Sequence, residues 1–244
     1  MNFVRLVSPV IPDKQPDRIA GMFDAIAPRY DLLNHVLSLG IDRRWRRRAI
    51  RSLSLSDRDV LLDVCTGTGD VALEAKRQAG VRRIIGVDFA GAMLAIGRNK
   101  VQAAGESGRI ELIRGDAANL PVRDASVDAV TIAFGIRNVE RPEAACRELA
   151  RALRPGGRLA ILEFGVPRIP GISTLYLWYF KYLLPRVGRV VSGHNAAYSY
   201  LPASVSAFPP PAEFMTILRH AGFVEVEAVS LTAGIVYLYV ARRA

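Results

Sequence analysis

The stretch from Val60 to Ala75 constrains the fold more than any other part of the sequence. An apolar run of strand length is followed by a short loop with two glycines, and then by a pattern typical of a helix. A strand, a glycine-rich turn and a helix in this order form the first crevice of a doubly wound α/β sheet. Gly67 and Gly69 let the backbone turn tightly and approach a ligand closely. The same spacing fits a loose dinucleotide-binding fingerprint, so the loop alone does not identify the ligand.

Three acidic residues narrow the choice of ligand. Asp63 closes the first strand-like run, Asp88 closes a second at 84–87, and Asp116 follows a third at 110–115. Because ligands of open α/β sheets lie beyond the carboxyl ends of the strands, we expect the three carboxylates to face one ligand. They would repel a pyrophosphate and favour a ligand with an ammonium, a sulfonium and ribose hydroxyls. The acids therefore predict S-adenosylmethionine as cofactor; the alternative is that they serve only as turn and N-cap residues.

Composition places the chain among globular proteins with a basic surface. Half of its 244 residues are apolar and 23% are charged, which suits one α/β domain with a sizeable core. The net charge of +10 would attract nucleic acid, anionic lipid or acidic partners. Cys65 and Cys146 have no disulfide or metal-ligand spacing, so we expect no metal site and a reducing, cytoplasmic location. We expect neither a signal peptide nor a membrane-spanning helix.

Strand-like and helix-like segments alternate from residue 59 to 164, and two more strands are expected within 223–242. The expected helices cover 19–30, 91–104, 142–153 and 212–221, and a turn is expected at 154–157. This pattern predicts an α/β fold with a mostly parallel seven-stranded sheet and helices on both faces. We treat residues 1–244 as a single domain, with an N-terminal helical segment at 17–55 and a lid-like insertion at 165–208.

Two segments stand apart from this alternation. Five arginines flank Trp45 between residues 43 and 48, which suits phosphates or anionic lipid headgroups, with the indole at a membrane interface. The alternative is a solvated helix face with Trp45, Ala49 and Ile50 packed inward. The second segment, Tyr176–Leu184, is aromatic and apolar on nearly every side. It fits a lid over an apolar substrate, a helix in the membrane interface, a buried helix, or a contact between copies in a homo-oligomer.

Four further blocks of sequence resemble signatures of the ubiquinone/menaquinone-biosynthesis C-methyltransferase family. In order they are Tyr30–Asn34 with Ser38 and Trp45, Phe134–Val139, Leu153–Leu159 with Glu163, and Tyr198–Ser204. The glycine loop marks only the wider methyltransferase superfamily, whereas the four blocks together are specific and match in order from about residue 18 to 242. The sequence departs from the family pattern at Asp42, Ala133, Gly165 and Tyr239.

The resemblance implies a Rossmann-like, class I S-adenosylmethionine-dependent methyltransferase fold and C-methylation of a polyprenyl quinol. The substrate that it favours is demethylmenaquinol, in menaquinone biosynthesis; the alternative is 2-polyprenyl-6-methoxy-benzoquinol, in ubiquinone biosynthesis. Together with the glycines and acids described above, it implies a cofactor site made of Asp63, Gly67, Thr68, Gly69, Asp88, Asp116 and Ala117. It places Arg137 and Asn138 in the quinol pocket, with Asp116 nearby, and we count Tyr198 with these two as a catalytic candidate.

The expected chemistry requires close positioning of the reactants and ionisation of a phenol. A quinol ring carbon becomes far more nucleophilic when a phenolic proton is lost, and phenols have a pKa near 10. Arg137 is our candidate for the cation that favours the phenolate; the alternative is an ordinary surface pair with Asp116 or Glu140. The proton acceptor stays open among an acid, a water, His194 and Tyr198, and the tyrosine also fits plain packing.

Two other functions compete with this interpretation. The positive charge and the arginine cluster would suit an RNA methyltransferase, but the aromatic residues are not interleaved with lysine and arginine as in a base-stacking platform. We therefore expect no nucleic-acid partner. A catalytically silent binding module would require a broken cofactor loop, and this loop is intact. Because a polyprenyl quinol resides in the bilayer, we expect peripheral association with a membrane surface.

Overall fold

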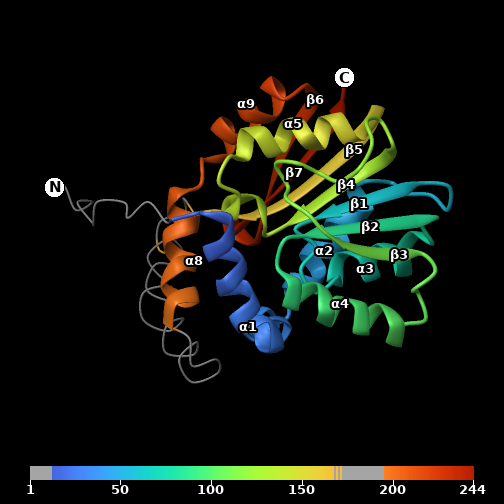
Figure 1. Cartoon of the computed structure of the whole chain (residues 1–244). Coiled ribbons are helices and arrows are strands. Elements are labelled where there is room, and N and C mark those ends of the chain that lie inside the picture. The colour runs from blue at the N-terminus through green and yellow to red at the C-terminus, as the bar shows by residue number, and fades with distance from the viewer. Residues whose placement is uncertain (1–12, 168, 170, 172–194) are drawn as a thin grey trace.

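The computed structural model describes residues 13–167, 169, 171 and 195–244, without the side chains of 195–199. In this part of the chain seven strands form one sheet in the order β3-β2-β1-β4-β5-β7-β6 (Figure 1). The strands are β1 (Val60–Val64), β2 (Arg83–Asp88), β3 (Ile110–Arg114), β4 (Val127–Ala133), β5 (Leu153–Phe164), β6 (Phe223–Leu231) and β7 (Val236–Arg243). Strand β7 is antiparallel to both of its neighbours, and the remaining pairs are parallel.

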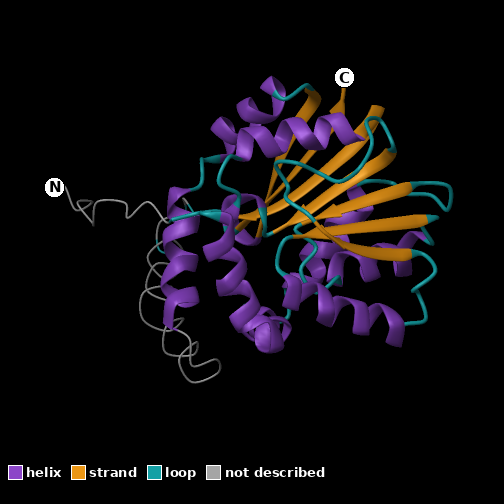
Figure 2. Cartoon of the chain, viewed as in Figure 1, coloured by secondary structure: helices purple, strands orange, loops and turns teal. Residues whose placement is uncertain are grey.

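Helices cover both faces of this sheet (Figure 2). They are α2 (Asp42–Ser52), α3 (Asp70–Ala79), α4 (Gly91–Ala103), α5 (Pro142–Ala152) and α9 (Pro211–His220). Helices α5 and α9 bury Leu149 and Phe214 in one apolar cluster, and α2, α3 and α4 contribute to a second. Successive residues of β1 alternate between the clusters, with Leu61 in the second and Leu62 in the first. The expected seven-stranded α/β fold is confirmed.

The central strands show why the sequence pattern was informative. Strand β4 is buried along almost its whole length, as its apolar run predicts for a parallel strand covered by helices on both sides. Strand β5 begins earlier than expected. Its register against β4 moves from Leu153 to Arg158, so the segment 154–157, which we expected to be a turn, bulges out of the ladder within the strand.

Helix α1 is longer than predicted. It runs from Pro16 to Leu37 and contains Pro28, whereas the pattern predicted a helix at 19–30. Ile26 packs against Met93 of α4, and α1 lies beside α8 (Asn195–Ala207) near the carboxyl ends of the parallel strands (Figure 1). Helix α1 therefore stands at the end of the sheet where ligands of this fold bind.

Helix α2 corrects one expectation. Trp45 is only 6% exposed and donates its indole N–H to Thr232 Oγ1 at 2.9 Å. The proposed place for this indole at a membrane interface is therefore wrong, and the inward-packed alternative with Ala49 and Ile50 is confirmed. Arg46 is also buried, paired with acidic side chains. The Tyr176–Leu184 run lies outside the described residues, which include only parts of the expected insertion.

Candidate active site

A cavity opens where β1, β2 and β4 end, next to α1. It encloses about 820 Å³ of empty space, counted with its open mouth. Its lining includes Tyr30 from α1, Asp88 from the end of β2, Ala133 and Phe134 from the end of β4, and Asn138 from a short 3-10 helix, η1 (Ile136–Asn138). This is the position in which open α/β sheets bind their ligands.

The glycine loop connects β1 to α3 beside this cavity. Gly69 has a φ of +79°, a conformation that favours glycine, and it is the N-cap of α3. Gly67, with a φ of +55°, donates its N–H to Asp88 Oδ2 at 2.8 Å. The loop is therefore held in place by a carboxylate that itself lines the cavity.

Asp88 is the most buried carboxylate of the cavity lining, at 7% exposed. Its Oδ1 accepts the N–H of Ala90 at 2.9 Å. Burial raises the pKa of Asp88, and the backbone donors of Ala90 and Gly67 act against that rise. A carboxylate has about four acceptor positions, so lone pairs remain on Asp88 for donors of a ligand, such as ribose hydroxyls.

Asp63 does not reach the cavity. Its side chain is fully buried, with Oδ2 accepting from Thr66 Oγ1 at 2.6 Å and Oδ1 from Thr131 Oγ1 at 2.7 Å. Burial raises the pKa of Asp63 to about 6. We expected three carboxylates to face one ligand, but the structure brings only Asp88 and Asp116 to the cavity, because two threonine hydroxyls take up the oxygens of Asp63.

Thr68 links the glycine loop to two helices. It is 2% exposed and donates its hydroxyl to Asp31 Oδ1 of α1 at 2.6 Å. Lys100 of α4 donates to Asp31 Oδ2 at 2.8 Å and to Thr68 Oγ1 at 3.1 Å, and it also pairs with Asp70 of α3. The side chain of Thr68 therefore anchors the loop, and Thr68 is not part of the cavity lining.

Two other predicted cofactor residues do line the cavity. Asp116 is exposed, and its Oδ1 accepts the N–H of Ala118 at 2.9 Å. Ala117 is 6% exposed and adds apolar surface to a lining that also includes Phe89 and Met93. Within the described residues no group of His, Cys, Asp or Glu side chains is arranged to hold a metal ion.

Arg137 lies beside the cavity but not in its lining. Its Nη1 donates to Glu163 Oε1 at 2.8 Å and to the carbonyl oxygen of Phe134, and its backbone N–H donates to Glu163 Oε2 at 3.1 Å. The two side chains are 7% and 0% exposed. Arg137 therefore forms a buried ion pair with Glu163, and neither Asp116 nor Glu140 is its partner.

Asn138 does line the cavity. Its Nδ2 donates to the carbonyl oxygen of Phe134 at 3.4 Å, and its buried Oδ1 has no hydrogen-bond partner among the described residues. Tyr198 belongs to α8, but its side chain is outside the described set. Tyr200 of the same helix has a buried hydroxyl that also finds no partner in the described part of the chain. Burial raises the pKa of Tyr200 to about 12.

Sequence reasoning missed several residues of the lining, including Lys14, Phe23 and Arg141. Phe23 and Tyr30 are seven residues apart on α1, a spacing that puts them on one helix face, so their shared position was open to prediction. Lys14 precedes the helix, and no local pattern marks it.

Relatives of the chain share nearly its full length. The chain is 46% identical over 225 residues to the ubiquinone/menaquinone biosynthesis C-methyltransferase UbiE of Geobacter sp. (strain M21), which covers 92% of this chain and 95% of the relative. It is 47% identical over 235 residues to the demethylmenaquinone methyltransferase of Deinococcus radiodurans, covering 95% and 96%. It is 46% identical over 222 residues to the protein of that name from Thermus thermophilus, covering 91% and 100%.

Solved structures share the fold at low sequence identity. The [4+2]-cyclase SpnF matches with a TM-score of 0.68 at 19% identity, over 96% of this chain and 98% of its own. A SAM-dependent methyltransferase from Aquifex aeolicus matches with a TM-score of 0.61 at 18% identity, over 94% and 99%. The model of the ubiE/COQ5 methyltransferase family matches residues 12–243. With relatives of this similarity and a family match over almost the whole sequence, the chain belongs to the ubiE/COQ5 methyltransferase family.

Proposed function

We propose that this protein transfers the methyl group of S-adenosylmethionine to a ring carbon of demethylmenaquinol. One observation carries the proposal: in a chain of this family, a single cavity brings together Asp88, with free carboxylate lone pairs, and Asn138, with an amide oxygen that has no partner among the described residues. The first suits a ribose and the second suits a quinol hydroxyl. Two relatives at 46% and 47% identity carry the name demethylmenaquinone methyltransferase, which favours a naphthoquinol over a benzoquinol.

The residues of the cavity fit S-adenosylmethionine. Asp88 would accept hydrogen bonds from ribose hydroxyls, and Phe89, Met93 and Ala117 offer apolar surface for the adenine ring. Asp116 would add negative charge near a cationic ligand. When bound, the cofactor supplies an electrophilic methyl group on a sulfonium.

The chain contributes positioning and exclusion of water. Asn138 Oδ1 would accept a quinol hydroxyl and so orient the ring, which matters because reacting atoms need to approach to about 3–3.5 Å. Phe134 and Tyr30 give that part of the cavity apolar walls. Arg137 acts through its neighbours as a positioning residue, since its bonds to Glu163 and to the Phe134 carbonyl hold the turn that carries Asn138.

A parallel assay with three methyl acceptors tests this function. Demethylmenaquinol, a demethylated polyprenyl benzoquinol and RNA are each incubated anaerobically with methyl-labelled S-adenosylmethionine. We expect label in the naphthoquinol, and less label at the same S-adenosylmethionine concentration when Asp88 is replaced by alanine. Label in the benzoquinol alone would move the protein to ubiquinone biosynthesis, and label in RNA alone would refute quinol methylation.

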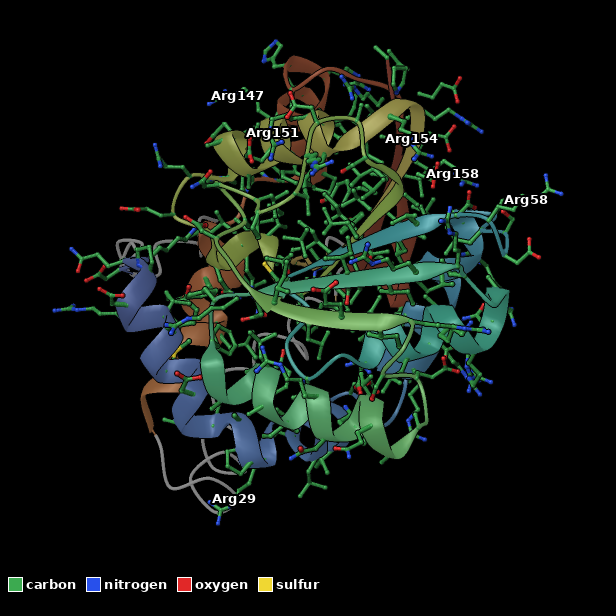
Figure 3. All side chains as sticks on the ribbon, turned by 45° about the vertical axis from the view of Figure 1, so that its right-hand side comes forward. Arg29, Arg58, Arg147, Arg151, Arg154 and Arg158 are labelled. Carbon is green, nitrogen blue, oxygen red and sulfur yellow. The ribbon has the colours of Figure 1, made fainter. Side chains whose placement is uncertain are left out.

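The distribution of arginines speaks against the RNA acceptor. Arg58, Arg154 and Arg158 lie at one end of the molecule, and Arg29 of α1 lies at another (Figure 3). Arg154 pairs with Asp128 at 2.6 Å, and Arg158 forms a further ion pair at 2.8 Å. Pairing of this kind reduces the net positive charge available to a phosphate backbone.

We also propose that the protein reaches its lipid-soluble substrate from a membrane surface. None of the described helices is long and apolar enough to cross a bilayer. The end of α1 and the turn after it expose Leu32, Val36 and Leu39, the last at 87%, at spacings that favour one face. Arg43 and Arg44 follow and are exposed. Apolar side chains beside cations suit the surface of an anionic bilayer.

Sedimentation with anionic vesicles tests this contact. Replacing Arg43 and Arg44 with glutamate should remove only the salt-sensitive part of the binding, and replacing Val36 and Leu39 with serine should remove the part that persists in salt. Arg46 is left unchanged, because it is buried in an ion-pair network. If the unchanged protein stays in the supernatant at low salt, the proposed surface is wrong.

A further inference from the structure

The cavity requires a group that ionises the quinol, and Arg137 is poorly placed for that task. Its guanidinium is 2.8 Å from the carboxylate of Glu163, which cancels its charge, and it does not line the cavity. It is always protonated and cannot accept a proton. Another group must therefore take the phenolic proton.

Lys14 has the features that Arg137 lacks. It lines the cavity and is half-buried. In the described part of the chain no carboxylate forms an ion pair with it, whereas Arg137 is paired with one carboxylate and Arg46 with two. The Lys14 amine is thus the basic group of the cavity that is left for a ligand, together with the more exposed Arg141.

The partners available in the cavity match the two hydroxyls of a quinol. Asn138 is 6% exposed, and its buried amide oxygen has no hydrogen-bond partner within the described residues. Lys14 offers an amine without a carboxylate partner. One hydroxyl can therefore be held by Asn138 while the other meets the amine.

We propose that the Nζ of Lys14 is the base that accepts the phenolic proton of the bound quinol; this rests on the proposed function. The O–H bond breaks, its electron pair stays with the oxygen, and the proton forms a new N–H bond on the amine. The phenolate places electron density on the ring carbon that is to be methylated. The methyl group bonds to that carbon as its bond to sulfur breaks, with the electron pair left on the sulfur. The carbon then loses its own hydrogen to water as a proton, its electron pair returns to the ring, and the ammonium gives its proton back to the oxygen.

The surroundings of Lys14 favour this role. Burial lowers the pKa of Lys14, which increases the neutral share of the amine near neutral pH; the negative charges of Glu163 and Glu143 oppose this effect and Arg137 supports it. The other ionisable side chains of the cavity lining are Tyr30, Cys65, Asp88, Asp116, Glu140 and Arg141. General-base catalysis by a positioned side chain contributes about 100- to 10,000-fold to a rate.

Two substitutions separate the base from a mere cation. Lys14→Arg keeps the positive charge but cannot accept a proton, and Lys14→Met keeps much of the length without charge. We expect both to lower kcat for demethylmenaquinol at pH 7 by about 100-fold or more. Because the quinol ionises by itself near pH 10, kcat of both variants should climb toward that of the unchanged protein as pH rises under anaerobic conditions. Arg18→Met is the matched control, since its exposed side chain pairs with exposed Asp13 and is not part of the described cavity lining.

A second readout does not depend on turnover. With S-adenosylhomocysteine in the cavity, the absorbance of added 1-naphthol should report more naphtholate on the unchanged protein than on Lys14→Met at pH 8. Calorimetry with S-adenosylmethionine should give equal affinities for both, which would show that the cofactor side is intact.

The outcomes are distinct. If Lys14→Arg methylates the quinol as fast as the unchanged protein at pH 7, the lysine is not the base. The same holds if the loss in Lys14→Met persists unchanged at pH 10. If the unchanged protein does not methylate the quinol at all, the proposed function fails before Lys14 is tested.

Discussion

The buried pair between Arg137 and Glu163 allows a sharp test of what holds the active-site turn. Replacing Arg137 with methionine removes the cation while Glu163 stays fully buried. Glu163 keeps two backbone donors, the N–H of Phe164 at 2.8 Å and that of residue 137 at 3.1 Å. A charged carboxylate would then remain in the core with hydrogen bonds but without its counter-ion.

The expected cost follows from that count. Breaking a buried ion pair by removing one partner costs about 3–5 kcal/mol of unfolding free energy. Because two backbone donors still bond to Glu163, we expect Arg137→Met to lie at the lower end, at about 3 kcal/mol. Adding Glu163→Gln removes the uncompensated charge, so the double variant should recover at least half of the loss. As a control, Arg154→Met breaks an exposed pair with Asp128, and about 0–1 kcal/mol is expected there.

Urea unfolding of the four proteins measures these differences, and calorimetry with S-adenosylmethionine separates stability from cofactor binding. Because Arg137 acts through the turn that carries Asn138, we expect Arg137→Met to lower quinol methylation much more than cofactor affinity. An unfolding free energy of Arg137→Met within about 1 kcal/mol of the unchanged protein would refute the argument, because the carboxylate would then not depend on its partner.

Four further substitutions test the cavity and its supports. Asp88→Ala should weaken S-adenosylmethionine binding by about 1–3 kcal/mol in calorimetry, and Asp116→Ala should weaken it less because Asp116 is exposed. Burial raises the pKa of Asp63 from 3.8 to about 6, so ionisation of this carboxyl costs the folded state about 3 kcal/mol above pH 6. The free energy of unfolding of Asp63→Asn should therefore rise relative to that of the unchanged protein as the pH increases from about 4 to 7. A difference that does not change with pH would contradict this. Gly135→Ala would place a Cβ 2.3 Å from the Cβ of Cys65, which should cost about 1–3 kcal/mol in urea unfolding and be relieved by adding Cys65→Gly.

We expected carboxylates at the carboxyl ends of parallel strands to face the ligand cavity. Asp88 does line the cavity and Asp63 does not, and the sheet explains the difference. The apolar runs reveal where parallel strands end, but not which way a side chain turns. Asp63 lies opposite Thr131 in the register of β1 and β4, so the two side chains share a face and bond at 2.7 Å. A register between strands so far apart in the chain is set by the packed sheet and leaves no local mark in the sequence.

Trp45 illustrates the same limit of prediction from sequence. An indole among arginines fits both a membrane interface and an amphipathic helix with its apolar side inward. The structure decides for the second, because the indole N–H bonds to Thr232, 187 residues further along the chain. The pattern of polar and apolar residues predicted an amphipathic helix. Whether the indole is buried or exposed depended on Thr232, which the sequence around Trp45 does not reveal.

The charge that faces the substrate is the feature that was hardest to predict from the residues taken one at a time. Arg137 directly follows a buried strand, which made it the obvious cation, yet Glu163 from the end of the next strand neutralises it. A residue's charge acts on a ligand only when no nearer opposite charge claims it. The basic group that a site leaves for its ligand is thus defined by the absence of a carboxylate partner, and among the described residues of the cavity Lys14 meets this condition, together with the more exposed Arg141; the sequence pattern does not mark Lys14.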